Sequence, residues 1–356
     1  MGTMLARYWH KRDDGQIECD LCPRACVLEE GQAGACANRA HRGGAMIATS
    51  YGRASGFCID PIEKKPLYHF LPGSAVLSFG TTGCNLVCRF CQNWDISRAR
   101  GGERLSEAAS PEAIAESAAR LGCRSVAFTY NDPVVFLEYA ADVADACHRL
   151  GIATVAVSAG YITEAARPDL FDRIDAANID LKSFSEAFYR RLCGARLDPV
   201  KETLRWLVHE SKVWVEITTL LIPGENDSPA EIAALSGWIA AELGPEVPLH
   251  FTAFHPDWKM TDRLPTDPAT LARARAIARA EGLRHVYTGN VRDREGGSTW
   301  CPSCGARLIG RDGYLLTEWG VSPEGRCLGC GTPLAGRFEA EPGTWGARRQ
   351  PVQLGA

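Results

Sequence analysis

The sequence lacks long hydrophobic runs: no segment of its 356 residues approaches the roughly 18 consecutive apolar residues that a membrane-spanning helix needs. The first residues, MGTMLARYWHKRDDGQ, contain no apolar core of a secretory signal. An excess of charge of one sign is also missing, because 39 Lys and Arg face 43 Asp and Glu, which gives a net charge of −4. Such a balance provides no overall attraction to nucleic acid or to an anionic membrane. We therefore expect a cytoplasmic protein whose partners include neither membranes nor nucleic acid.

A dinucleotide-binding fingerprint is absent too, because no Gly-x-Gly-x-x-Gly follows the first strand-like run. From residue 75 onward, short apolar runs alternate with Ala-rich amphipathic stretches. The runs that we interpret as buried strands are 75–80, 124–130, 153–158, 176–182, 213–220 and 248–254, with a seventh at 283–287. Helix starts between them are marked by N-capping residues, namely Ser110, Ser228 with Glu231 as a capping box, and Asp267. This alternation predicts an α/β fold of parallel βα units, either a partial barrel or a doubly wound open sheet.

Cysteine is abundant: there are 15, and three tight groups hold four, three and four of them. In a reducing compartment, closely spaced thiols indicate metal binding or catalysis rather than disulfides. The groups are Cys19, Cys22, Cys26 and Cys36; Cys84, Cys88 and Cys91; and Cys301, Cys304, Cys327 and Cys330. The expected parts of the chain are a Cys-rich metal module at 1–50, the α/β region at 51–297 with an irregular start at 51–73, a second Cys-rich module at 298–340, and a loose tail at 341–356.

The middle group, in GCNLVCRFCQNW, has the spacing Cys-x3-Cys-x2-Cys and directly follows the first predicted strand of the α/β region. Structural zinc takes four ligands, and cubane iron–sulfur clusters usually take four thiolates. Three thiolates therefore leave one iron of a 4Fe-4S cluster without a protein ligand, open to a small chelating molecule. S-adenosylmethionine (SAM) meets this need through its amino and carboxylate groups. The alternative is a group of buried thiols, or a zinc site completed by a distant ligand.

Polar residues follow the ends of the predicted strands, where barrel-type α/β folds place their sites. Single residues of this kind are often turn or cap groups, but together they favour a site. The candidates are Thr129, Tyr130, Asn131, Asp132, Ser158, Asp180, Lys182, Glu216 and His250. For Asp180 and Lys182, the alternative is a buried ion pair.

The triplet, with the aromatic Phe90 before its third cysteine, resembles the motif of the radical SAM superfamily. This resemblance implies a (βα)6 partial TIM-type barrel, a 4Fe-4S cluster on Cys84, Cys88 and Cys91, and an electron donor of the flavodoxin or ferredoxin type. It further implies that residues 129–132 occupy the place of the superfamily's Gly-Gly-Glu stretch, which contacts the SAM amino group. In this chain the glycines of that stretch are replaced, and Asp132 stands where the superfamily has Glu. By the same resemblance, Ser158 and Asp180 contact the ribose or the methionine part.

A closer resemblance covers roughly residues 17–338 and is carried by DPIEKKPLYHFLPGSAVLS, FTYNDPVVFLEYA, NIDLKSFSEAFYRRLCGA and CPSCGARLIGRDGY, in this order. These motifs resemble the AmmeMemoRadiSam system radical SAM enzymes, relatives of the pyruvate formate-lyase activating enzymes. The resemblance implies that Lys182 pairs with the SAM carboxylate, and that the partners are Memo-like and Amme-type proteins. It does not supply a substrate.

The two outer groups have four thiols each. Cys301, Cys304, Cys327 and Cys330 form a zinc-ribbon or rubredoxin-like pattern, for which we expect zinc. Cys19, Cys22, Cys26 and Cys36 allow either zinc or an auxiliary iron–sulfur cluster, with a slight preference for zinc because four ligands close the site.

The sequence thus predicts an enzyme that reductively cleaves SAM to a 5′-deoxyadenosyl radical and then abstracts hydrogen from a substrate. One variant of this activity is that of a glycyl-radical-enzyme activating enzyme. The alternative from another class is a non-catalytic zinc-ribbon protein that acts in metal binding or macromolecular interaction.

Overall fold

The computed structural model describes residues 4–99 and 106–354. Its central element is a sheet with a run of parallel strands. These are β7 (Ala75–Gly80), β9 (Ser125–Phe128), β10 (Ala153–Ser158), β11 (Ala176–Asp180), β12 (Trp214–Leu221), β13 (Leu249–Ala253) and β14 (Val286–Gly289). Each pairs in parallel with the next in this order. Within the described residues no ladder joins β14 back to the first strands, so the barrel stays open. The α/β fold with a partial barrel is therefore confirmed, and it includes the seventh strand.

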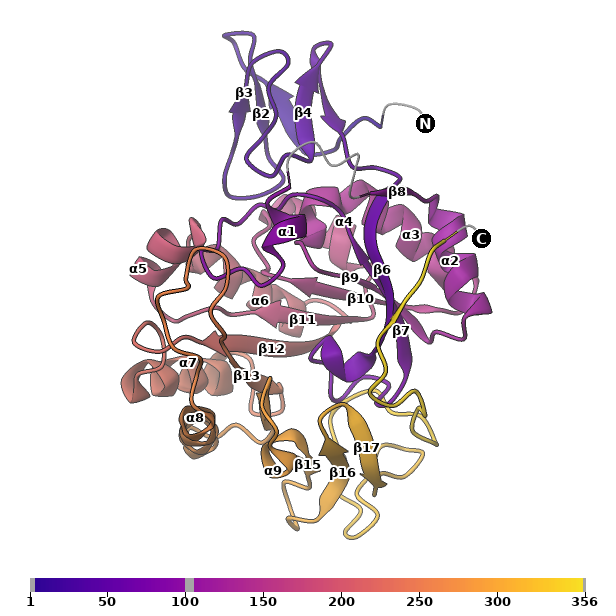
Figure 1. Cartoon of the computed structure of the whole chain (residues 1–356), viewed down its shortest axis with the longest axis vertical. Coiled ribbons are helices and arrows are strands. Elements are labelled where there is room, and N and C mark those ends of the chain that lie inside the picture. The colour runs from indigo at the N-terminus through magenta and orange to yellow at the C-terminus, as the bar shows by residue number, and fades with distance from the viewer. Residues whose placement is uncertain (1–3, 100–105, 355–356) are drawn as a thin grey trace.

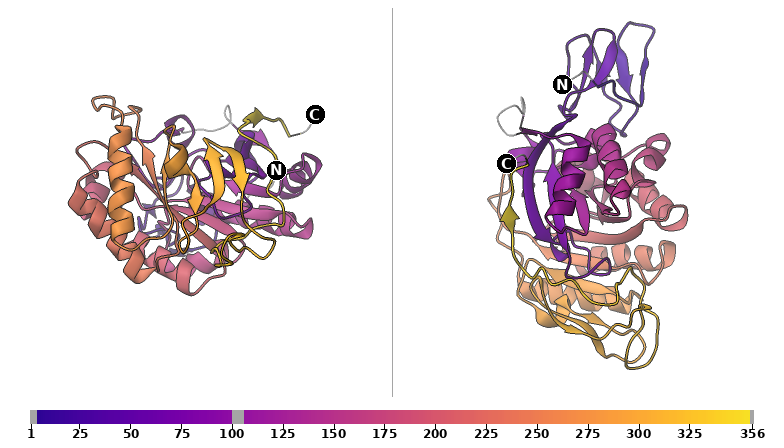
Figure 2. Two further views of the ribbon diagram at one scale, coloured as in Figure 1. Left: turned by 90° about the horizontal axis from the view of Figure 1, so that it is seen from below. Right: turned by 90° about the vertical axis from the view of Figure 1, so that its right-hand side faces the viewer.

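Helices between the strands cover the outer face of the sheet (Figures 1 and 2). The longer ones are α2 (Pro111–Arg120), α3 (Leu137–Arg149), α6 (Asp198–His209), α7 (Pro229–Glu242) and α8 (Pro268–Ala280). The short helical segments are η1 (Ile62–Lys64), α1 (Trp94–Ser97), η3 (Pro133–Phe136), η4 (Glu164–Ala166), α4 (Arg167–Phe171), α5 (Glu186–Phe188), the π-helical η5 (Tyr189–Cys193) and α9 (Arg294–Gly297). Apolar residues of the strands and of the inner helix faces form the main core.

The predicted helix starts are confirmed, with one difference. Ser110 accepts a hydrogen bond from the amide of Ala113 at 3.1 Å, and Asp267 accepts one from Ala269 at 2.8 Å. Ser228 caps α7 in the same way, but Glu231 does not complete a capping box. Its carboxylate instead accepts hydrogen bonds from Ser183 and Phe184, so it joins α7 to the loop after β11.

The N-terminal module stands at one end of the barrel (Figure 2). It contains β1 (Trp9–Lys11), β2 (Ile17–Cys19), β3 (Val27–Leu28), β4 (Arg39–Arg42) and β5 (Ala45–Ala48), all paired antiparallel. The buried Arg39 anchors it to α3, because its guanidinium donates to both carboxylate oxygens of Glu138 at 2.7 and 2.8 Å. A buried bidentate ion pair of this kind fixes the position of the module.

The C-terminal module lies at the opposite end (Figure 1) and contains β15 (Thr299–Trp300), β16 (Arg307–Asp312) and β17 (Leu315–Trp319). Its anchor is Arg311, which is 1% exposed. The Arg311 guanidinium donates to the Tyr68 carbonyl at 2.8 Å and lies 3.7 Å from a carboxylate oxygen of Glu63.

Two segments differ from the sequence prediction. The region 51–73, expected to be irregular, contains the long strand β6 (Arg53–Pro61), which pairs antiparallel with β7 and with β8 (Glu107–Ala108). The tail, expected to be loose, runs back along this edge, where β18 (Gln350–Pro351) pairs with β6. Both segments are held by backbone hydrogen bonds to an exposed strand edge, and side-chain periodicity gives no signal of such pairing.

Among the helices of the described residues, none combines the length and the hydropathy needed to cross a membrane.

Candidate functional site

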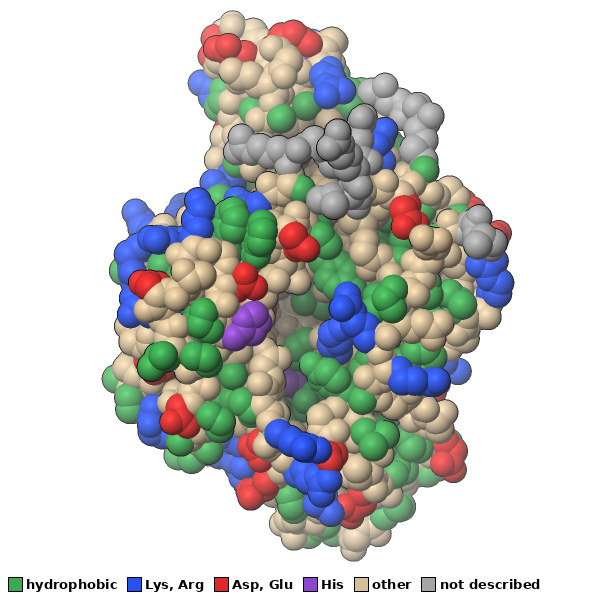
Figure 3. Space-filling model, in the orientation of Figure 1, with side chains coloured by type: hydrophobic (Ala, Val, Ile, Leu, Met, Phe, Trp, Pro, Cys, Tyr) green, Lys and Arg blue, Asp and Glu red, His purple; other side chains and the backbone are tan. Residues whose placement is uncertain are grey.

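A cavity of about 360 Å³ opens where the parallel strands end. Figure 3 shows this face of the molecule hollowed near its middle. Most of the residues predicted from the sequence line this cavity. They are Cys84, Cys88, Phe90, Cys91, Thr129, Tyr130, Asn131, Asp132, Ser158, Asp180 and Lys182. Four neighbouring strands, β7, β9, β10 and β11, and the loops after them thus contribute these residues to one site.

The loop with Cys84, Cys88 and Cys91 follows β7 and is held in place by neighbouring loops. Asn131 accepts a hydrogen bond from the Thr81 amide at 2.9 Å and donates to the Gly83 carbonyl at 2.7 Å. Farther along, the amides of Val87 and Arg89 donate to the carbonyls of Cys193 and Leu192, both at 2.9 Å. The loop is therefore fixed by backbone pairing to the π-helical η5, which positions its thiols.

The three thiols are largely buried, and burial favours the protonated form. It raises the pKa of Cys84 to about 12 and also raises the pKa of Cys91. The pKa of Cys88 is raised well above its usual value, first by a hydrogen bond with the thiol of Cys193 and then by burial. Binding of a cationic metal centre would deprotonate these thiols.

The sulfurs of the triplet are not arranged as the ligands of a single ion are. Within the described part of the chain, the sulfurs of the triplet are not gathered within 4.8 Å of one another, as ligands of a single ion would be. Thiolates that bind different irons of one cluster point outward from it and stand farther apart. Three thiols on one fixed loop beside a cavity therefore fit a 4Fe-4S cluster with one iron free of cysteine.

The segment 129–132 forms a tight turn after β9. Tyr130 has a left-handed backbone, with φ at 71°. Asp132 is buried, and its carboxylate accepts hydrogen bonds from the amides of Val134 and Ala159 and from the hydroxyl of Ser158, at 2.9–3.1 Å. The Asp132 and Ser158 side chains are thus partly used in joining two neighbouring strand ends.

Asp180 and Lys182 form an ion pair of 2.8 Å at the end of β11. Burial opposes the charge of the Lys182 ammonium, but the Asp180 carboxylate and the nearby thiol Cys88 keep its pKa well above the usual value. The ammonium also lies 6.0 Å from the centre of the Phe90 ring. The site therefore holds a charged ion pair beside the triplet.

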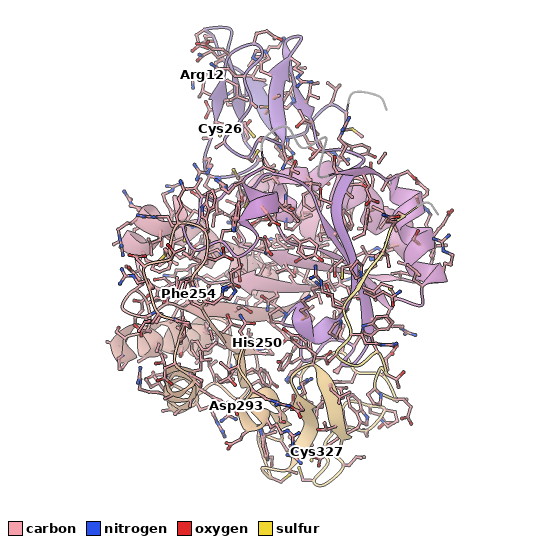
Figure 4. The ribbon with its side chains drawn as sticks, in the orientation of Figure 1. Arg12, Cys26, His250, Phe254, Asp293 and Cys327 are labelled. Carbon is pink, nitrogen blue, oxygen red and sulfur yellow. The ribbon has the colours of Figure 1, made fainter. Side chains whose placement is uncertain are left out.

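Two predicted residues are corrected by the structure: Glu216 and His250 do not line the cavity. The buried Glu216 carboxylate accepts hydrogen bonds from the amides of Tyr68 and His69, from Trp214 Nε1 and from His250 Nε2, at 2.7–3.0 Å. Figure 4 shows His250 on the side of the barrel nearer to the C-terminal module. These side chains come from earlier positions in β12 and β13 than the rim, so they close the inside of the barrel rather than face the cavity.

Several residues of the site are not among those predicted from the sequence. Lys65, Thr252, Asn290 and Tyr314 line the cavity, and Cys193 lies against Cys88. Tyr314 is the most distant in sequence, since it comes from the turn between β16 and β17 of the C-terminal module. The motifs DPIEKKP, RLCGA and RDGY contain three of these residues and are the signals that could have found them.

Cys301, Cys304, Cys327 and Cys330 form a second candidate centre, with all four sulfurs within 4.8 Å of one another. The sulfurs of Cys301 and Cys330 are 3.6 Å apart, and those of Cys304 and Cys327 are 3.7 Å apart. Four sulfurs placed tetrahedrally about 2.3 Å from one ion would be about 3.8 Å apart. The group therefore could hold a single metal ion.

Comparisons with known proteins agree with this site. The model of the radical SAM superfamily matches residues 79–235. The uncharacterized protein MJ0808 of Methanocaldococcus jannaschii is 42% identical over 332 residues, which cover 92% of this chain and 98% of that protein.

Two solved structures are similar at low sequence identity. A radical SAM methyltransferase from Sphaerobacter thermophilus has a TM-score of 0.50 at 15% identity and covers 81% of this chain and 78% of that one. A domain of a pyruvate-formate lyase-activating enzyme from Bacteroides vulgatus has a TM-score of 0.42 at 17% identity and covers 47% of this chain and 99% of that one. At these identities the likeness concerns the fold alone.

The superfamily model begins in β7 and spans the thiol loop and the strands that line most of the cavity. The relative matches nearly the whole length of the chain. Together with the open parallel barrel and the three buried thiols at its rim, these matches show that the chain belongs to the radical SAM superfamily.

Proposed function

We propose that this protein cleaves SAM reductively at a 4Fe-4S cluster on Cys84, Cys88 and Cys91, and uses the product to abstract hydrogen from a substrate. The observation that carries the proposal is that these three thiols and the polar strand ends line one cavity. When bound, the cluster supplies one electron to the sulfonium of SAM, whose carbon–sulfur bond breaks to give methionine and a 5′-deoxyadenosyl radical.

The chain's own residues supply binding and orientation. The Lys182 ammonium is placed to pair with the SAM carboxylate, because it is charged and lies next to Cys88. Gln92 Nε2 and Thr218 Oγ1 line the cavity and have no hydrogen-bond partner among the described residues. Buried polar groups without partners cost free energy, so these two fit a polar ligand that satisfies them.

The apolar part of the lining protects a reactive intermediate. Leu86, Phe90, Val157 and Leu220 face the cavity between its polar groups. Such side chains exclude water and offer few weak bonds near the reacting carbon. Their role is to keep the radical from side reactions until the substrate meets it.

Because the reaction consumes one electron, we propose a protein of the flavodoxin or ferredoxin class as the donor. Memo-like and Amme-type proteins are proposed as partners on the sequence resemblance alone. We further propose zinc at Cys301, Cys304, Cys327 and Cys330, since a closed set of four thiolates at this spacing suits a structural zinc ion.

The test is SAM cleavage by the anaerobically reconstituted protein with dithionite. We expect 5′-deoxyadenosine and methionine from the wild-type protein and none from Cys84→Ala, Cys88→Ala or Cys91→Ala. The matched control is Cys147→Ala, which removes a buried thiol of α3 away from the cavity and should leave product formation unchanged. Cleavage by the triplet variants at the wild-type rate would contradict the proposal.

A further inference from the structure

The cysteines of the N-terminal module take no part in the site described above. Cys19 ends β2, Cys22 and Cys26 lie in the turn to β3, and Cys36 lies just before β4. The Cys19 amide donates to the Cys26 carbonyl at 3.0 Å, which brings the two ends of this turn together. Ala25 and Ala37 have left-handed backbones, with φ at 46° and 61°. Tight turns therefore direct four thiols of a short segment into one region.

The four thiols lie near one another. The thiols of Cys26 and Cys36 lie close enough to Cys19 and Cys22 to act on both of them electrostatically. In addition, a Cβ at Gly34 would lie 3.8 Å from the sulfur of Cys26. The group thus shares one environment, as a metal centre requires.

The spacing of these sulfurs differs from that of the C-terminal group. Among the described residues, no three of Cys19, Cys22, Cys26 and Cys36 lie within 4.8 Å of one another, whereas Cys301, Cys304, Cys327 and Cys330 all do. One zinc ion would hold its sulfurs about 3.8 Å apart. Thiolates of an iron–sulfur cluster bind separate irons and stand farther apart. Within one chain, the N-terminal group is therefore more widely spaced than the C-terminal group, which is the direction that a cluster requires.

Hydrogen-bond donors surround the N-terminal group. The backbone amides of Leu21, Arg24 and Asn38 lie near the sulfurs of Cys19, Cys22 and Cys36, respectively, and favour their anionic forms. The guanidinium of Arg39, which is paired with Glu138, also lies near Cys19 and Cys36. Donors and positive charge of this kind stabilise the anionic sulfurs of iron–sulfur clusters.

An unsatisfied donor gives a second, independent indication. Asn38 is 1% exposed, and its Nδ2 has no hydrogen-bond partner among the described residues. It lies in the contact between Cys36 and Gly83, because a Cβ at Gly83 would be 3.2 Å from Asn38 Nδ2 and would overlap the Cys36 carbonyl. The module thus keeps a buried, unsatisfied donor at its contact with the thiol loop, and such a donor fits a polar or anionic group bound nearby.

We propose that Cys19, Cys22, Cys26 and Cys36 bind an iron–sulfur cluster, separate from the one proposed at Cys84, Cys88 and Cys91. This site adjoins the other, since Cys36 packs against Gly83, the residue before Cys84. Arg24 strengthens the contact by donating to the carbonyls of Asn85 and Gly194. Figure 4 shows Cys26 in the part of the module nearer to the barrel.

The test uses the full chain with Cys84→Ala, Cys88→Ala and Cys91→Ala combined, so that the site of the proposed function is removed. After anaerobic reconstitution with iron, sulfide and an equal concentration of zinc, we expect iron and acid-labile sulfide in equal amounts to remain, with four of each for a cubane. Reduction with dithionite should give the electron paramagnetic resonance signal of a reduced cluster. Zinc in place of iron at the N-terminal group would overturn the proposal.

Further variants on this background assign the remaining iron. Cys22→Ser with Cys26→Ser should remove it, whereas Cys123→Ser with Cys147→Ser, which changes two thiols outside the group, should retain it. If the first pair fails to fold, Cys26→Ser alone should still change the g-values of the remaining signal. An unchanged signal in a folded Cys26→Ser protein would overturn the proposal. A failure of SAM cleavage by the wild-type protein does not affect this outcome, because the triplet is already absent.

Discussion

At the scale of single residues, the site depends on charges and donors that the fold keeps away from water. Lys182 is the clearest case, because its ammonium stays charged although it is buried. The Asp180 carboxylate, 2.8 Å away, offsets part of the cost of burying this charge. A second anion, such as the carboxylate of SAM, would interact strongly with it in this low-dielectric environment.

We predict that Lys182→Gln weakens SAM binding to the reconstituted protein by about 10- to 100-fold, the effect of losing a charged hydrogen bond of about 1.5–3 kcal/mol. Isothermal titration under anaerobic conditions measures this change. The control is Lys201→Gln, since Lys201 lies over the rings of Phe184 and Trp238 outside the cavity. Equal dissociation constants for Lys182→Gln and wild type would show that Lys182 has no role in binding SAM.

At the scale of elements, the thiol loop after β7 is the part that the structure holds most tightly. Asn131 from the next strand end bonds to it, η5 pairs with its middle, and the N-terminal module packs against its start. Gly83 is the point of closest approach. It has φ at 88°, and a side chain there would overlap the Cys36 carbonyl.

We predict that Gly83→Ala destabilises the protein by about 1–3 kcal/mol more than Gly122→Ala does. Both glycines have positive φ, so both substitutions carry the cost of a left-handed backbone of about 1–2 kcal/mol. Only Gly83 has a close neighbour, whereas a Cβ at Gly122 would have nothing within 4 Å. Denaturant unfolding measures the difference, and equal losses of stability would contradict the close packing at Gly83.

At the scale of the whole molecule, the C-terminal module closes the end of the barrel and also contributes to the cavity. Arg311 of the C-terminal module and Glu63 of the barrel form a buried ion pair between the two. Tyr314, from the same β16–β17 hairpin as Arg311, lines the cavity. His69 links the same two parts through both of its ring nitrogens. Its Nδ1 is hydrogen-bonded to the Ala335 carbonyl, and its Nε2 is hydrogen-bonded to the Tyr287 hydroxyl. The module therefore belongs to the folded unit of the barrel.

We predict that Arg311→Leu lowers the free energy of unfolding by about 3–5 kcal/mol, because it leaves the buried Glu63 without its cation. The control on the same strand is Arg307→Leu, which breaks an ion pair with Glu318 whose side chains are more than 40% exposed. Such exposed pairs contribute about 0–1 kcal/mol. Similar losses in the free energy of unfolding for the two variants would show that Arg311 and Glu63 do not act as a buried ion pair.

Stability should also depend on pH through His69. Burial lowers its pKa to about 3, and the nearby His285 adds to this effect, while Glu216 opposes it. The unfolded chain takes up a proton near pH 6.5 and the folded one only near pH 3, so acid favours the unfolded chain between these values.

We expect the free energy of unfolding to fall by up to about 1.4 kcal/mol per pH unit from this group as the pH drops below about 6.5. The His69→Gln variant should have a lower free energy of unfolding at pH 7.5 than the wild-type protein. Its free energy of unfolding should also change less with pH, because up to one proton fewer is taken up on unfolding. Unfolding in urea at several pH values measures both slopes. An unchanged slope in the variant would mean that His69 is not kept neutral by the fold.

The alternating α/β pattern, the three thiol groups and eleven of the residues that line the cavity could be predicted from the sequence. Strand periodicity, helix caps and cysteine spacing are local signals, and the residues after strand ends converge wherever parallel strands form one sheet. For this reason Thr129, Ser158 and Asp180 could be named before their neighbours were known. The cluster ligands Cys84, Cys88 and Cys91 were predicted from the Cys-x3-Cys-x2-Cys motif.

Contacts between distant segments set which polar residues face the cavity and which close the barrel. Glu216 and Thr218 lie on one face of β12, two residues apart, yet Glu216 is used up by four donors while Thr218 lines the cavity. The contributions of Tyr314 and Cys193, the pairing of β18 with β6, and the different spacings of the two four-thiol groups also depend on contacts between segments far apart in the chain. Such contacts are set by packing and by backbone hydrogen bonds between elements, and these leave no periodic trace in the sequence.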